Sequence, residues 1–200
     1  MTNNVENKYI LTNWHLFKNI ISTSAALSGV FAVNFPMYLM PVTYYINLYV
    51  FMDLFFARRD MFAHHLLVLS FFAAIMVYEF PQDYKYYFMQ QVMRFEYSTI
   101  FYSGGPILLH YLSSQPSSKI TPWIPTIRTF CHVGFAATFF KVRIYDFTGK
   151  VIFLANVYSP DNFPSFLAFA HLISTTWLFY ALNLYWFQMI LWKLVPHKKT

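Results

Sequence analysis

Long apolar runs separated by short polar segments are the feature that most constrains this sequence. Of its 200 residues, 58% are hydrophobic and 22% aromatic, and only 11% are charged. A soluble domain usually has about a quarter of its residues charged, so this chain has too few charged side chains to cover a water-exposed surface. The sequence therefore predicts an all-α fold, a polytopic bundle of transmembrane helices.

The apolar runs predict about six spans, with five to seven as the range. Runs of roughly 17–25 apolar residues cross the hydrocarbon of a bilayer, and they lie at about 19–35, 42–57, 62–79, 87–112, 123–143 and 164–192. We interpret Gly104-Gly105-Pro106 as a kink in the fourth span. The apolar patch within residues 144–162 is too short to span and could be re-entrant or interfacial, although a span through 146–160 would make seven.

The basic residues lie mostly at the ends of these runs and do not form one patch. The net charge of +6 therefore does not predict nucleic-acid binding. Lysine and arginine in short loops favour the cytosolic side. With six spans, both termini lie on the same side of the membrane as most of the basic residues, so both are predicted to be cytosolic. The basic residues on that side are Lys8, Lys18, Arg58, Arg59, Lys119, Lys193, Lys198 and Lys199.

The adjacent histidines His64 and His65 begin the third run. Neighbouring residues on a helix point about 100° apart, so the two rings cannot share one face. If one helix ran unbroken from Asp53, then Asp60 and His64 would lie with it on one stripe. A carboxylate beside an imidazole can fix its tautomer for proton transfer. The alternative is that these residues are simply hydrated at head-group level.

Glu96 lies near the middle of the fourth run, where a carboxylate costs about 2.5 kcal/mol or more. Thr99, Ser103 and His110 follow on the same helical face. Arg94 points roughly 200° away, so each charge is expected to pair with another span. The alternative is a structural network that holds the bundle together.

The remaining polar groups within the runs, which include His132 and His171, could line an internal cavity. The histidines are scattered and form no His-x-x-x-His or His-x-x-His-His cluster, so no metal site and no cofactor are predicted. The sequence contains no Gly-x-Ser-x-Gly elbow, and Cys131 is not paired with a histidine in sequence. Nucleophilic catalysis is therefore not predicted.

Four segments resemble, in the right order, those of TLC-domain proteins, the family of ceramide synthases and translocating-chain-associated membrane proteins. The first combines Asp53, Arg59-Asp60 and the double histidine. The others are Phe-Glu-Tyr-Ser-Thr-Ile-Phe at 95–101, Phe-Phe-Lys-Val-Arg-Ile-Tyr at 139–145 and Leu-Asn-Leu-Tyr-Trp-Phe at 182–187. The resemblance divides the chain into a polar segment 1–18, a first span and hairpin 19–39, a TLC-like transmembrane domain 40–195 and a basic tail 196–200.

In ceramide synthases the double histidine belongs to a longer motif whose second half contains His-Asp-x-x-Asp. Here residues 91–96 read Gln-Val-Met-Arg-Phe-Glu, so that half is missing and the chain resembles the small non-synthase members more closely. The resemblance implies a role in lipid homeostasis, with sphingolipids as one candidate class, and a lipid or acyl chain in an intramembrane cavity.

The site expected from this resemblance has two parts. The candidate catalytic residues are His64, His65 and Glu96. The expected polar lining of the cavity is Asp53, Asp60, Arg94, Ser98, Thr99, His110, Arg143, His171 and Asn183.

The resemblance leaves two alternative functions open. One is an N-acyltransferase of ceramide-synthase type with acyl-CoA as co-substrate, and the other is a receptor or chaperone for membrane or secretory cargo. The expected partners are membrane lipids, with protein cargo or a second copy of the chain as candidates. The expected compartment is the endoplasmic reticulum.

Overall fold

The computed structural model describes residues 11–56, 59–114 and 121–194, without the side chains of Arg59, Asp60 and Leu194. These residues form helices and turns and contain no strand, so the predicted all-α fold is confirmed. The α-helices are α2 (Asn13–Asn34), α3 (Leu39–Leu54), α4 (Arg59–Val77), α5 (Gln82–Met93), α6 (Glu96–Ser113), α7 (Ile124–Phe139) and α8 (Phe166–Leu194).

The fourth predicted span is two helices instead of one. Pro106 lies inside α6, and the helix is interrupted at Arg94 and Phe95 instead. At this interruption the Phe95 N–H donates to the carbonyl of Val92 at 3.0 Å, and the Ser98 N–H donates to that of Phe95 at 3.1 Å. These i→i−3 bonds tighten the chain at the junction. The α6 helix runs on through Gly104-Gly105-Pro106, and the kink at this position stays a prediction.

The α7 helix continues directly into π-helix, at Phe140–Asp146 and again at Thr148–Ile152. Short 3₁₀ turns at Ala155–Tyr158 and Pro160–Asn162 then lead to α8. Much of the patch predicted as re-entrant or interfacial thus extends a helix. The Thr148 hydroxyl bonds the Ile144 carbonyl, and such side-chain competition for backbone carbonyls disturbs regular α-helix.

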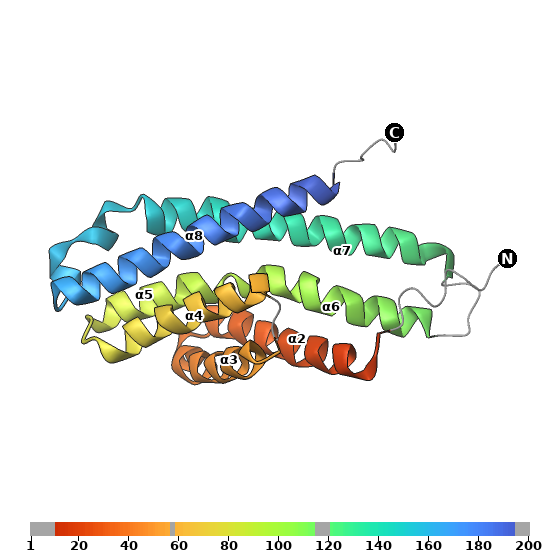
Figure 1. Ribbon diagram of the computed structural model, residues 1–200, viewed down its shortest axis with the longest axis horizontal. Coiled ribbons are helices and arrows are strands. Elements are labelled where there is room, and N and C mark those ends of the chain that lie inside the picture. The colour runs from red at the N-terminus through yellow and green to blue at the C-terminus, as the bar shows by residue number, and fades with distance from the viewer. Residues whose placement is uncertain (1–10, 57–58, 115–120, 195–200) are drawn as a thin grey trace.

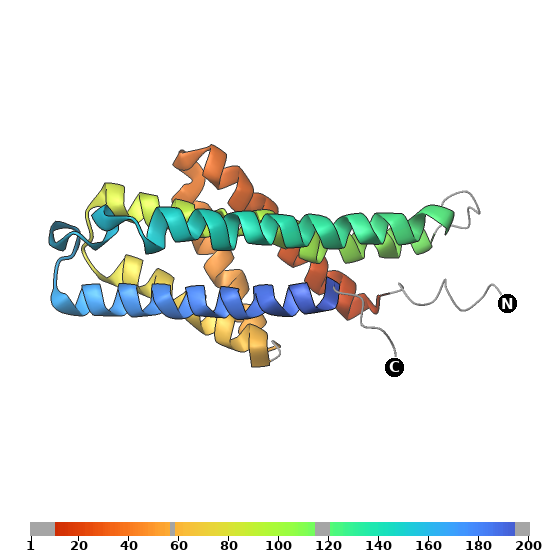
Figure 2. The same cartoon turned by 90° about the horizontal axis from the view of Figure 1, so that it is seen from above.

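The helices form an elongated bundle (Figure 1). Seen from above, α7 and α8 run along its long axis, whereas α3 crosses that axis (Figure 2). The main helix pairs are α2 with α6, α6 with α7, and α4 with α8. The buried face of α2 consists of Ala25, Ala26, Gly29 and Ala32, and such small residues let helix backbones approach closely.

Two helices among the described residues are long and apolar enough to cross a membrane, Asn13–Asn34 and Phe166–Lys193. Met61–Val77 is a shorter apolar helix. The count of six spans stays a prediction.

Candidate functional site

A small cavity lies where α3, α4, α5, α6, α8 and the π-helical segment converge. Its volume is about 30 Å³. A cavity needs about 10–15 Å³ measured in this way to hold a water, so this one has room for water but not for a hydrocarbon chain. Three ionisable side chains, His64, Glu96 and Arg143, line it together with Ile46, Val50, Val68, Phe72, Val92, Met93, Phe95 and Phe179.

Arg143 reaches the cavity from the π-helical segment and is only 6% exposed. Its Nε donates to Ser98 Oγ at 2.9 Å, and Nη1 donates to Asn183 Oδ1 at 3.4 Å. Nη2 donates to Thr99 Oγ1 at 3.3 Å and to the Phe95 carbonyl at 3.4 Å. A guanidinium carries five N–H donors, so protein acceptors occupy most of them. Arg143 therefore contributes positive charge to the cavity, whereas few of its hydrogen-bond donors remain free.

These contacts also provide hydrogen bonds for the backbone at the interruption between α5 and α6. The Phe95 carbonyl lies at that interruption, and it accepts bonds from Arg143 and from the Ser98 hydroxyl at 2.8 Å. Irregular backbone within a membrane bundle is tolerated where protein groups satisfy it. The structure thus brings together Ser98, Thr99, Arg143 and Asn183 from the expected polar lining.

Glu96 is the first residue of α6 and lines the cavity beside Arg143. In the described part of the chain, no ion pair joins Glu96 to Arg143. The Glu96 side chain packs against Gly29 of α2, where a Cβ added to the glycine would lie 2.7 Å from Glu96 Cγ. The Glu96 side chain therefore contacts α2 through Cγ and Cβ and also lines the cavity.

His64 of α4 lines the cavity and packs against α8. Its ring centroid is 5.3 Å from that of Phe179 and 5.0 Å from that of Trp186. Its Nδ1 is buried and has no hydrogen-bond partner among the described residues. The ring is therefore held by these aromatic contacts.

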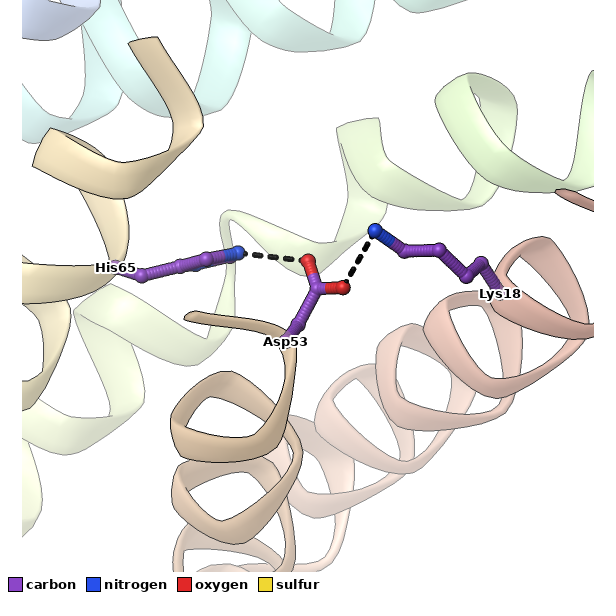
Figure 3. A network of polar contacts seen from close by, with 3 residues as sticks. All are labelled: Lys18, Asp53 and His65. Atoms are coloured by element: carbon purple, nitrogen blue, oxygen red, sulfur yellow. Dashed lines mark hydrogen bonds and ion pairs between the residues drawn. The ribbon is translucent and has the colours of Figure 1, made fainter. Parts of the chain in front are cut away.

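His65 belongs to a different contact, which joins three helices (Figure 3). Its Nε2 is 2.9 Å from Asp53 Oδ2, and Lys18 Nζ is 2.7 Å from Asp53 Oδ1. The His65 side chain is 4% exposed and that of Asp53 is 12% exposed. Because α3 ends at Leu54, the unbroken helix from Asp53 to His64 is wrong. Asp53, near the end of α3, instead contacts His65 of the next helix, α4.

Two of the expected lining histidines lie elsewhere. His171 on α8 has its Nε2 3.0 Å from Ser70 Oγ on α4. His110 lies near the end of α6, where its Nδ1 accepts from the Leu11 N–H at 3.1 Å. Neither of them lines the cavity. The structure therefore does not bring these two histidines together with Glu96 at this cavity.

Arg94 and Asp60 complete the expected lining. Arg94 directly follows α5 and does not line the cavity, and its Nε is buried without a partner among the described residues. The side chain of Asp60 lies outside the described residues.

Sequence reasoning missed two contributors, Lys18 as the partner of Asp53 and Gly29 as the contact of Glu96. Lys18 was visible only as an orienting charge at the start of a span, and Gly29 carried no signal because its role depends on a residue far along the chain. Among the described residues, no group of three or more His, Cys, Asp or Glu side chains is arranged to hold a metal ion.

A comparison with protein families finds one described as TLC domain, whose model matches residues 8–192. No curated protein and no solved structure matches the chain.

Proposed function

Because the chain belongs to the TLC-domain family, we propose that this membrane protein acts in lipid homeostasis by holding the polar head of a lipid. The observation that carries the proposal is the convergence of His64, Glu96 and Arg143 on one otherwise apolar cavity. Ionisable groups inside a membrane bundle are costly and usually functional. The endoplasmic reticulum is the compartment that we propose from the family resemblance.

The free polar groups of the cavity favour a head that donates hydrogen bonds. Most of the Arg143 donors are occupied by Ser98, Thr99, Asn183 and the Phe95 carbonyl. The carboxylate of Glu96, which also has a hydrogen bond with the Thr99 side chain, can accept further bonds, which suits a hydroxyl or an amine. The volume of about 30 Å³ fits head atoms alone, so lining side chains would move aside for the chain of the lipid.

Photo-crosslinking with a clickable sphingosine and a clickable fatty acid tests this proposal. We expect His64→Ala and Glu96→Gln each to reduce labelling about tenfold, since a hydrogen bond to a charged group contributes about 1.5–3 kcal/mol. His110→Ala is the matched control, because His110 lies away from the cavity. Labelling of either cavity variant at the parent level would contradict the proposal.

The contact between His65 and Asp53 supports a second candidate function, N-acyl transfer from acyl-CoA. The 2.9 Å distance from His65 Nε2 to Asp53 Oδ2 is the geometry in which a carboxylate orients a general base. Purified protein would be incubated with acyl-CoA and sphinganine, and the products identified by mass spectrometry. If the amount of N-acylated product does not exceed that of a His64→Ala/His65→Ala variant, this function is excluded.

A further inference from the structure

Gly29, a residue of α2 without a side chain, touches the cavity wall from outside. A Cβ at this position would lie 2.7 Å from Cγ of Glu96, 3.1 Å from its Cβ and 3.3 Å from Cδ1 of Ile46. Contacts of Cβ under 3.0 Å essentially never occur, so any side chain larger than hydrogen would displace its neighbours. An alanine at position 29 would therefore force the Glu96 side chain to shift.

Both of these neighbours line the cavity, whereas no residue of α2 does. Glu96 and Ile46 therefore stand between α2 and the cavity. A displacement of either side chain away from α2 is directed toward the cavity. With a volume of about 30 Å³, the cavity has little space to receive even one additional methyl group.

We propose that Gly29 is a positioning residue, which fixes the Glu96 carboxylate at the cavity wall and sets how large a polar head the cavity accepts. This inference rests on the proposed lipid-binding function. It assigns Gly29 no contact with the lipid itself, since its effect passes through Glu96 and Ile46.

The first experiment measures photo-labelling of Gly29→Ala by clickable sphingosine. We expect labelling to fall about as far as in Glu96→Gln. Two matched controls add the same methyl group elsewhere, since a Cβ at Gly149 meets nothing within 4 Å and one at Gly104 makes only ordinary contacts, the shortest 3.6 Å to Thr23. Both controls are expected to label like the parent.

The second experiment separates the role of Gly29 from lipid binding. The unfolding temperatures of Gly29→Ala, Glu96→Ala and the double variant are compared in detergent. Gly29→Ala is expected to lower the unfolding temperature less in the Glu96→Ala background, because the clashing Cγ is then absent. If Gly29→Ala alone fails to fold and the double variant folds, that rescue supports the same contact.

Equal losses of unfolding temperature in both backgrounds would overturn the positioning role of Gly29. Parent-level labelling of Gly29→Ala would also overturn it if Glu96→Gln loses labelling. Parent-level labelling of Glu96→Gln would instead overturn the proposed function, while the coupling in stability would still report the contact between the two residues.

Discussion

At the scale of single residues, Arg143 connects α6, α8 and the junction between α5 and α6 through its hydrogen bonds. One guanidinium bonds Ser98 and Thr99 on α6, Asn183 on α8 and the Phe95 carbonyl between α5 and α6. Its planar group also lies over the rings of Phe95 and Phe139, at 5.1 and 5.2 Å, where cations interact favourably with aromatic faces. A lysine cannot reproduce this planar arrangement of donors.

We therefore expect Arg143→Met to lower the free energy of unfolding by about 1–3 kcal/mol, the usual cost of leaving buried polar partners without their hydrogen bonds. Arg143→Lys should recover only part of this loss. Thermal unfolding in detergent measures both variants. Lys193→Met, at an exposed position near the end of α8, is the control and should change the free energy by about 0.5 kcal/mol or less. A parent-like unfolding temperature for Arg143→Met would contradict this role.

At the scale of elements, close approach of α6 and α7 depends on a glycine. A Cβ at Gly134 on α7 would lie 2.7 Å from Cε1 of Phe101 on α6. Gly105 of α6 has a similar relation to Cys131 of α7, with a distance of 3.2 Å to its Cβ. Small residues at these positions allow the two helices to pack.

Gly134→Ala should consequently destabilise the protein by about 1–3 kcal/mol, the usual cost of overpacking. Gly149→Ala, with open space around its Cβ, is the control and should unfold like the parent. Chemical or thermal unfolding of the two variants in the same detergent makes the comparison. Equal stability would show that the Phe101 ring moves aside without cost.

The apolar runs were sufficient to predict the all-α bundle, because their length and their lack of charged residues can be counted in the sequence of each run alone. They could not predict the interruption at Arg94 and Phe95. That interruption is satisfied by Arg143, which lies 48 residues from Phe95 in sequence. Likewise, the sequence drew attention to Asp53 and to both histidines, but only the packing of α3 against α4 decides which ring Asp53 contacts.

At the scale of the whole molecule, the start of α2 and the end of α8 lie at the same end of the bundle (Figures 1 and 2). This arrangement agrees with an even number of crossings. Six spans with most basic loops on one side would place both termini in the cytosol.

Tags placed at either end of the chain should then be digested by protease added to the outside of intact microsomes. A luminal control protein must stay protected in the same sample. Protection of the C-terminal tag alone would favour seven spans, including one through residues 146–160.

The contacts of Arg143 have a consequence for the order of assembly during synthesis. They close loops of 45 residues to Ser98 and 40 residues to Asn183, and long loops must close before such contacts stabilise anything. The polar groups at the start of α6 are thus synthesised before their partner Arg143. Translation must pass the middle of α8 before the set is complete, so no nascent chain ending short of Asn183 can contain the finished site.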